Sequence, residues 1–456
     1  MKMSVLSGSP KGDTSLTLQY LNYIKKHFPE HEFNIFHIGK DIKKIEEGEV
    51  YFDSILEEIE KSDGIIWVFP VYVFLAPSPV HRFIEIISEK NKKDIFRDKY
   101  ATTITTSVHF YDHTAHNYIH SICEDLGMKY LDGFSAEMQD LLKEEEREKL
   151  LKFSKNFFNF IKEKMPVERK FKTPCYEMPE YKPGDIKEVP GKNNKKIVLL
   201  TDAREEDTNL NSMIQVFQKL CPCQVEVINI REIDMKGGCV SCYLCTYDNE
   251  CIYKDGFAHI INKHVLPADG VVMAARIKDR YLSSRWKMYM DRSFFKGHCP
   301  VFEGKQFAYL ISGPLGDIAN LRQVLEAKVQ VGRANMAGIV TDEYEDSHYI
   351  TSLIETLGKQ ILWGIEENFV KPRNFLEVGG HMIFRDLVYR GWGMFRADYL
   401  FYKKHNLFDY PHKNIGERLQ NLKYAIMLML PGIRKEFYKI AKEEMIKPHK
   451  KVIEKF

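Results

Sequence analysis

The sequence lacks an excess of charge of either sign. Its 456 residues include 66 basic and 64 acidic residues, which leaves a formal net charge of +2. A nearly neutral chain has no long-range field that attracts nucleic acid or an anionic membrane surface. We therefore expect neither of these as a partner.

Long hydrophobic runs are also missing. The amino-terminal segment enters a short apolar stretch at once and has no basic region followed by a long apolar one, so it does not resemble a signal peptide. The longest later apolar run, residues 425–430, is far shorter than the roughly 20 residues that span a bilayer. These absences predict a cytoplasmic protein without a transmembrane segment.

Cysteines are few and unevenly distributed. The chain has nine, and four of them fall within residues 239–251. An odd number with one dense cluster does not match the disulfide framework of a secreted domain. Clustered cysteines in an intracellular chain indicate metal or redox chemistry.

One pattern occurs twice in the chain. Residues 63–85 align without a gap with residues 269–291, which pairs Ser78 with Ser284 and Glu85 with Asp291. Upstream, residues 5–7 match residues 199–201, and the second copy has extra residues in the interval that holds the cysteine cluster. The simplest interpretation is a duplicated fold with a cysteine loop in the second copy only.

Each copy alternates apolar, strand-like runs with helical patterns such as 16–27 and 210–220. The predicted strands are residues 3–6, 33–38, 64–69 and 101–106 in the first copy, and 196–200, 225–230, 270–274 and 307–312 in the second. Continuously apolar strands separated by helices predict parallel sheets covered on both faces. Ligands of such folds bind at the carboxyl ends of the strands.

The pattern also predicts four segments. Residues 1–165 and 196–362 are the two α/β domains, and residues 166–195 form a proline-rich linker that contains five prolines. Residues 363–456 form a helical carboxyl-terminal extension rich in aromatic and basic residues, with helices near 415–430 and 433–447.

The loop after the first strand has the composition of a phosphate site. Small residues allow close backbone approach, and hydroxyls and free amides at a helix start can surround an anion. The candidate residues are Ser7, Ser9, Pro10, Lys11, Thr14 and Ser15. An alternative is an ordinary strand–helix turn with Thr14 or Ser15 as the N-cap.

Two further loops follow in order, 70–74 with its Pro-Val-Tyr sequence and 106–109. Together with the first loop, GSPKGDTS, the segment FPVYVFLAPSP resembles the flavodoxin-like NAD(P)H-dependent FMN and quinone reductases. The resemblance implies FMN in the first domain, with its phosphate in the first loop. It also implies that one side of the flavin ring lies near Pro70, Val71, Tyr72 and Phe74, and the other near Thr106, Ser107 and His109.

The resemblance implies an α/β fold: two tandem flavodoxin-like, doubly wound parallel-sheet domains plus the helical extension. The second copy departs from the pattern, because its first loop, 201–209, has four carboxylates and no glycine. Like charges there would oppose phosphate binding. Flavin binding by the second domain stays open, and its basic residues are read either as a nucleotide-phosphate site or as a solvated surface: Arg276, Lys278 and Arg280.

The cysteine loop has the spacing C-x2-C-x2-C-x5-C. Three thiolates at steps of three suit one side of an iron–sulfur cubane, whereas structural zinc usually takes two separated pairs. The loop resembles that of the iron–sulfur flavoproteins, which implies a [4Fe–4S] cluster held by Cys239, Cys242, Cys245 and Cys251. Zinc, free thiols and disulfides remain alternatives.

These features predict an oxidoreductase that passes electrons from NAD(P)H or a reduced partner through FMN, and through the cluster, to a small-molecule acceptor or redox partner protein. No nucleophile–base set stands out, so no catalytic residue is assigned. The alternatives are a non-catalytic electron carrier or redox sensor, and a zinc-stabilised interaction protein. We expect the two domains to form an intrachain pseudo-dimer, which is open to further homo-oligomerisation.

Overall fold

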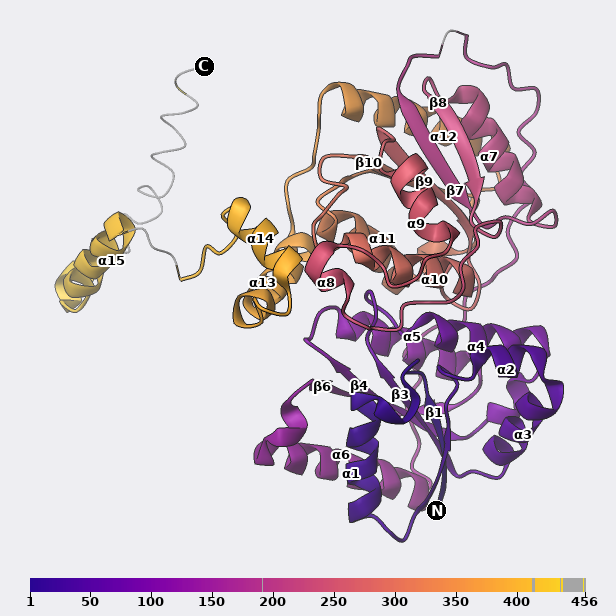
Figure 1. The fold of residues 1–456 in the computed structure, drawn as a ribbon, viewed down its shortest axis with the longest axis vertical. Helices are drawn as coiled ribbons and strands as arrows, with labels where there is room; N and C mark the ends of the chain where they lie inside the picture. Colours follow the sequence, from indigo (N-terminus) through magenta and orange to yellow (C-terminus); the bar gives the residue numbers. More distant parts are fainter. Residues whose placement is uncertain (191, 412–414, 435, 438–453, 455–456) are drawn as a thin grey trace. The chain divides into compact units, whose positions relative to one another are not determined.

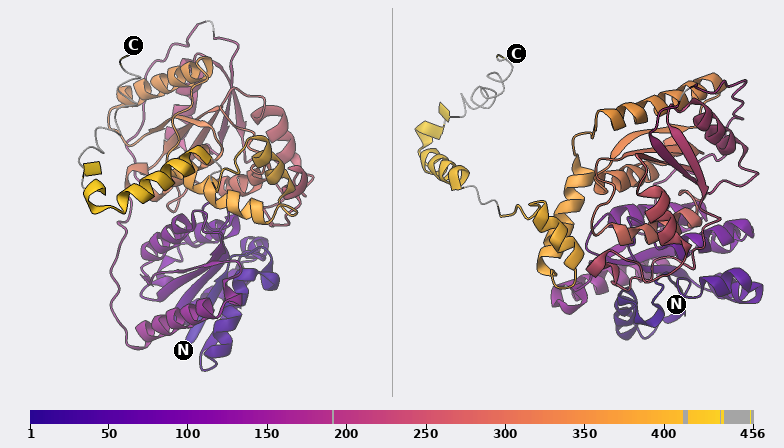
Figure 2. Two further views of the ribbon diagram at one scale, coloured as in Figure 1. Left: turned by 90° about the vertical axis from the view of Figure 1, so that its left-hand side faces the viewer. Right: turned by 45° about the horizontal axis from the view of Figure 1, so that its top comes forward.

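The computed structural model describes residues 1–190, 192–411, 415–434, 436–437 and 454. They belong to two compact units, residues 1–401 and 402–456, and each unit is described by itself. The first unit contains two parallel β-sheets with helices on both faces (Figures 1 and 2). The described part of the chain has no helix that is long and apolar enough to cross a membrane.

The first sheet has the strand order β2-β1-β3-β4-β5, and β6 also pairs with β4. All of these pairings are parallel. This is the doubly wound order of flavodoxin-like folds. The strands are β1 (Lys2–Ser7), β2 (Glu32–Phe36), β3 (Gly64–Pro70), β4 (Tyr100–Ser107), β5 (Lys129–Tyr130) and β6 (Phe134–Glu137).

The second sheet repeats this order as β8-β7-β9-β10-β11, again with parallel pairings. Its strands are β7 (Lys196–Thr201), β8 (Gln224–Asn229), β9 (Gly270–Arg276), β10 (Gln306–Ser312) and β11 (Asn335–Thr341). All eight predicted strands are present, whereas β5, β6 and β11 were not predicted. The predicted fold class is therefore confirmed.

The outer faces of the two sheets are covered in the same way. On the first sheet, α1 (Leu16–His27) and α6 (Glu144–Lys162) bury their apolar sides against β1, β3 and β4. On the second, α7 (Thr208–Leu220) and α12 (Ser347–Glu366) do the same. In α1 the buried positions include Leu18 and Leu21, and basic residues fill the last turn, where they complement the helix dipole.

The inner faces share one hydrophobic core. Its buried residues come from both sheets and from helices of both copies. The inner helices are α3 (Glu49–Glu60), α4 (Ser78–Glu89) and α5 (Asp112–Asp125) of the first copy, and α10 (Ser284–Ser293) and α11 (Ala319–Val331) of the second. Helices α4 and α10 pack against each other, so the carboxyl-end loops of both sheets lie beside one interface.

The remaining helices are α2 (Ile42–Glu47), α8 (Cys245–Asp248), α9 (Gly256–Ile260), α13 (Phe375–Arg390) and α14 (Arg396–Lys404), with α15 (Ile415–Leu428) in the second unit. Helix α15 confirms the helix predicted near 415–430, and most of the predicted helix 433–447 lies outside the described residues. Between α6 and β7 the described residues form no helix or strand. The predicted boundaries at 165, 195 and 362 stay predictions.

Candidate functional site

The three predicted loops of the first copy leave the sheet at one edge, because β1, β3 and β4 are parallel neighbours. The amide of Gly8 donates to the Val68 carbonyl at 2.8 Å, which ties the first loop to β3. The amide of Val71 donates to the Thr106 carbonyl at 3.1 Å, which ties the second loop to the third. This edge is where doubly wound folds bind their ligands.

The first loop has unused hydrogen-bonding groups. Ser15 stands at the N-cap position of α1, but its side chain makes no capping bond. The Thr14 hydroxyl donates instead to the Lys11 carbonyl at 2.9 Å. The Ser7 hydroxyl is buried without a partner. Since neither Thr14 nor Ser15 caps the helix, the free amides and hydroxyls suit an anion at the start of α1. Ser9 is also buried, whereas Lys11 is exposed and Pro10 is half-buried.

Two glycines give this loop its shape. A Cβ on Gly39 would lie 2.3 Å from the carbonyl oxygen of Gly8, so only glycine allows the two backbones to approach this closely. The amide of Gly39 donates to the Ser7 carbonyl at 2.9 Å. The loop is therefore fixed by backbone contacts before any ligand binds.

The second loop is a tight turn in which the amides and carbonyls of Tyr72 and Leu75 pair reciprocally, at 2.8 and 3.1 Å. Its two central residues, Val73 and Phe74, have φ of 41° and 72°. A β-branched residue at positive φ is strained, and such strain concentrates at functional sites. Pro70, Val71 and Tyr72 are half-buried, whereas the Phe74 ring points into the core, with its centroid 4.8 Å from that of Tyr111.

The third loop begins with Thr106, whose hydroxyl lies 2.6 Å from that of Thr17 in α1. The Ser107 hydroxyl accepts a hydrogen bond from the amide of His109 at 2.9 Å. The His109 ring is exposed and lies 2.8 Å from a carboxylate oxygen of Asp112. Although burial alone would raise the pKa of Asp112, hydrogen bonds from Ser135 and His109 hold it below its usual value.

The cysteine loop of the second copy lies against these loops of the first. The Lys11 ammonium sits 5.0 Å from the ring centroid of Tyr243. The backbone at Gly238 touches the Ser78 side chain, because a Cβ there would be 2.3 Å from the Ser78 hydroxyl oxygen. Burial raises the pKa of Tyr72, as does nearby Cys239. Residues that are more than 150 positions apart in the sequence therefore share one site.

All nine cysteines are free thiols. In the cluster, burial raises the pKa of Cys239 to about 11 and that of Cys245 to about 12, and the other cysteines of the loop add to both shifts. Cys242 is exposed and Cys251 is half-buried. The four thiols are thus within electrostatic reach of one another. In the described part of the chain, no group of three or more His, Cys, Asp or Glu side chains is arranged to hold a metal ion.

Nitrogen atoms of neighbouring residues lie close to two sulfurs of this loop. His298 places Nε2 3.2 Å from Sγ of Cys245, and its Nδ1 lies 2.8 Å from a carboxylate oxygen of Asp398. Asp398 thereby fixes the ring so that Nε2 faces the sulfur. The Ser241 amide donates to Cys239 Sγ at 3.4 Å. Arg292, paired with Asp255 at 2.8 Å, lies within electrostatic reach of Cys251.

The corresponding loops of the second copy satisfy their own donors. Asp342 accepts from the Gly313 amide at 2.8 Å and from the Ser312 hydroxyl at 2.7 Å. Asp202 accepts from the Trp286 indole at 2.8 Å and from the Ser283 hydroxyl. Carboxylates of the chain therefore hold donors that an anionic ligand would need.

Of the basic residues beside these loops, Arg276 is exposed and Lys278 is half-buried, whereas Arg280 is buried. Arg276 pairs with Asp207 at 3.0 Å. Arg280 is only 4% exposed and forms two hydrogen bonds with Asp125 of the first copy, at 2.5 and 2.8 Å. Both predicted interpretations of Arg280 are therefore wrong, because its partner lies across the interface and satisfies the guanidinium.

Two functional candidates escaped the sequence analysis. One is the Lys287–Asp291 pair on α10, and the other is the contact of His298 and Asp398 with Cys245. A charged residue between the apolar positions Trp286 and Met288 was a signal for the first. No local pattern links His298 to Asp398, because they come from distant segments.

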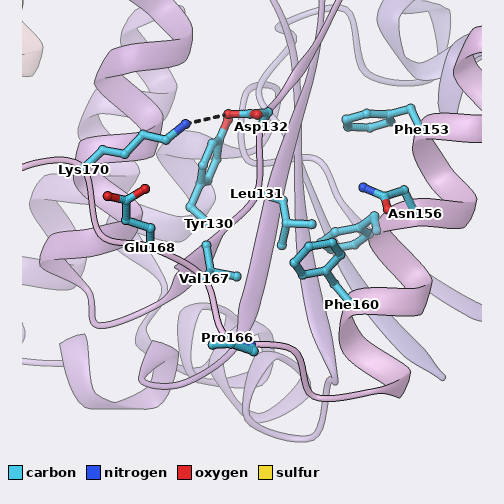
Figure 3. Close-up of a pocket in the computed structure, with 11 residues that line it drawn as sticks. Tyr130, Leu131, Asp132, Phe153, Asn156, Phe160, Pro166, Val167, Glu168 and Lys170 are labelled. Carbon is cyan, nitrogen blue, oxygen red and sulfur yellow. Dashed lines mark hydrogen bonds and ion pairs between the residues drawn. The ribbon is translucent and has the colours of Figure 1, made fainter.

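A separate pocket of about 470 Å³ lies beside α6 and the start of the linker (Figure 3). Its lining includes Tyr130 and Phe160, and an ion pair of 2.9 Å joins Asp132 to Lys170 beside them. Tyr130 belongs to β5, which pairs with the first residues of β4. The pocket is thus at the opposite end of β4 from the three loops, and no predicted site residue lines it.

Residues 1–139 match the family model of NADPH-dependent FMN reductases. Comparison with curated proteins finds no match. Among solved structures, the chain is similar to the flavoenzyme NAD(P)H:(acceptor) oxidoreductase FerB from Paracoccus denitrificans, with 18% identity over 36% of this chain and 97% of that one, at a TM-score of 0.30.

Two further structures align over a similar part of the chain. General stress protein 14 from Treponema denticola, solved in complex with FMN, is 10% identical over 36% of this chain and 99% of its own, with a TM-score of 0.27. The NAD(P)H:quinone oxidoreductase from Methanothermobacter marburgensis is 12% identical over 36% and 97%, with a TM-score of 0.28.

Proposed function

We propose that the chain is an NAD(P)H-dependent flavin oxidoreductase that binds FMN in its first domain. The observation that supports this most directly is the set of three loops at the carboxyl edge of the first sheet, with the unpaired Ser7 hydroxyl at the end of β1 and no side-chain cap at the start of α1. The same residues fall within the match to the NADPH-dependent FMN reductase family. Bound FMN would supply the transfer of hydride and electrons.

The residues of the site have separate tasks in this proposal. Ser7, Ser9 and Ser15 donate hydrogen bonds to the phosphate, and Lys11 adds positive charge at the mouth of the loop. The strained turn at Val73 presents Tyr72 toward the ring. These roles need little motion, because the loops are already held by the backbone hydrogen bonds of Gly8, Gly39 and Val71.

We also propose that the cysteine loop holds a [4Fe–4S] cluster. The donor chemistry fits, since the loop carries four free thiols, and the Ser241 amide and His298 Nε2 lie 3.4 and 3.2 Å from two of the sulfurs. A cubane binds each thiolate at a different iron, so the sulfurs need not converge on one point as they would around zinc. The loop lies against Lys11 and Tyr72, which favours electron exchange between the two domains.

The first experiment is FMN titration of the purified full-length chain, followed by steady-state assays. Quenching of FMN fluorescence at a stoichiometry of one per chain is expected, with NADH or NADPH oxidation when a quinone or ferricyanide is the acceptor. A chain that stays colourless and does not quench FMN fluorescence would refute the proposal. FMN binding with reduction only by dithionite or a reduced carrier protein would instead identify an electron carrier or sensor.

Metal analysis tests the cluster independently. After anaerobic purification we expect about four irons and four sulfides per chain, on the stoichiometry of one cubane. Zinc without iron would identify a structural zinc site and leave the proposed role of the first domain untouched.

A further inference from the structure

Two buried, charged side chains of the second domain hold both ends of the second loop of the first domain. Lys287 and Asp291 stand one turn apart on α10, and their side chains are 0% and 1% exposed. The Lys287 ammonium donates to the Tyr72 carbonyl at 2.9 Å. Asp291 accepts from the Ser78 amide at 2.9 Å. The segment between Tyr72 and Ser78 is therefore hydrogen-bonded to the second domain at both of its ends.

A buried ion pair of this kind contributes little net stability to an interface. Taking two charges out of water costs several kcal/mol per ion, and apolar residues of similar volume usually stabilise as well. Burial lowers the pKa of Lys287 and raises that of Asp291, whereas the attraction between the two groups opposes both shifts. A buried pair that contacts the backbone of a candidate cofactor loop fits a positioning role better than a purely structural one.

The equivalent positions of the first domain do not repeat the arrangement. At the matching offset in α4 stand His81 and Glu85. Glu85 accepts from the Ser284 amide at 2.6 Å, as Asp291 does from Ser78. His81, however, stacks on Tyr118 and leaves its Nε2 without a partner. An ion pair that hydrogen-bonds to both ends of a loop is therefore found at the loop that we assign to FMN and not at the equivalent loop of the second copy.

We propose that Lys287 and Asp291 are positioning residues of the FMN site, supplied by the second domain. The inference rests on the proposed binding of FMN by the first domain. Lys287 fixes the carbonyl of Tyr72 and sets a positive charge behind the flavin side of the loop, and Asp291 fixes the amide that starts α4.

The test compares Lys287→Met, Asp291→Asn and Glu85→Gln in the full-length chain. FMN affinity is measured by fluorescence titration, and the midpoint potential of bound FMN by anaerobic dye titration. Lys287→Met should weaken FMN binding at least tenfold and shift the potential to more negative values, because a positive charge favours the electron-rich flavin. Asp291→Asn should shift the potential in the positive direction.

Glu85→Gln is the matched control, since it neutralises the carboxylate that accepts the equivalent hydrogen bond on the other side of the interface. It should change the FMN affinity by less than twofold, and it should leave the midpoint potential of bound FMN within error of the wild-type value. Equal effects of Asp291→Asn and Glu85→Gln, or shifts of the same sign for Lys287→Met and Asp291→Asn, would overturn the proposal. Wild-type protein that binds no FMN would instead refute the proposed function itself, and this inference with it.

A variant that keeps the interface apolar guards against misfolding. Lys287→Met combined with Asp291→Leu removes both charges together, so no unpaired charge stays buried. The double variant should fold with the thermal stability of the wild type and still bind FMN at least tenfold more weakly. Full FMN affinity in the folded double variant would show that the pair has no positioning role.

Discussion

Arg280 of the second copy and Asp125 of the first form a buried, bidentate ion pair, with Nε–Oδ2 and Nη2–Oδ1 distances of 2.5 and 2.8 Å. Arg280 also donates to the Lys172 carbonyl at 2.7 Å, and its backbone amide donates to the Tyr176 hydroxyl at 3.0 Å. One side chain therefore joins both copies and the segment between them. Loss of this side chain should therefore lower the stability of the whole first unit.

Arg280→Met should lower the free energy of unfolding by about 3–5 kcal/mol, because it leaves the half-buried Asp125 carboxylate with only the exposed Arg169 guanidinium, 3.8 Å away. Urea unfolding followed by circular dichroism measures this change. Arg97→Met, which removes an exposed pair with Asp94, is the control and should cost about 1 kcal/mol or less. Similar losses of unfolding free energy in both variants would show that the Arg280–Asp125 pair contributes no more to stability than an exposed ion pair.

Gly39→Ala should distort the first loop, because the new Cβ would meet the Gly8 carbonyl oxygen at 2.3 Å. Overpacking of this kind costs about 1–3 kcal/mol, and the displaced loop should bind FMN more weakly. Gly393→Ala has no atom within 4 Å of its new Cβ and should leave FMN affinity unchanged. Isothermal titration of both variants with FMN measures the difference.

His116 should make the protein acid-sensitive. Burial lowers its folded-state pKa from 6.5 to about 4, and its Nε2 lies 2.8 Å from the Thr105 hydroxyl. Between these two values the unfolded chain binds more protons than the folded one, so stability falls as the pH drops from 6.5 toward 4. His116 alone contributes about 2–3 kcal/mol to this loss. His116→Gln should flatten the pH dependence of unfolding, and an unchanged slope would contradict the prediction.

Cys242→Ser and Cys245→Ser should lose iron, keep FMN and lose rapid electron transfer to or from the flavin. The reason is that a serine hydroxyl is a poor substitute for a thiolate ligand. Stopped-flow absorbance measures flavin reduction and reoxidation in the variants. Cys175→Ser, an exposed cysteine outside the loop, is the control. Unchanged flavin kinetics without iron would show that the second domain does not exchange electrons with the first.

His298→Phe keeps the ring volume but removes the nitrogen Nε2, which lies 3.2 Å from Cys245 Sγ. Loss of such a partner typically weakens metal binding 10–100-fold, so iron should be released faster to a chelator. His298→Gln retains an amide donor and should restore part of the retention. FMN content should stay constant in both variants. Equal iron retention in His298→Phe and wild type would assign His298 to packing alone.

The sequence alone was sufficient to predict the central strands of each sheet. Strands such as β1 and β3 are buried on both faces. The residues of β3 are therefore apolar, and those of β1 are mostly apolar between Met3 and Leu6, whereas α1 shows its buried stripe at helical spacing. The strands β5, β6 and β11 were missed because their signals are weak. β5 has only two residues, and β11 contains Gly338, which lowers its strand propensity.

Part of the site could likewise be predicted from the sequence, and the rest depends on the tertiary structure. The order of the three loops, the cysteine spacing and the pairing of Ser78 with Ser284 are written in contiguous residues, because turns and helix starts depend on local chemistry. The contact of Lys287 with Tyr72 joins residues 215 positions apart. Periodicity states that a face is buried, but not what buries it. Only the packing of α4 against α10 decided that the second domain completes the loop of the first.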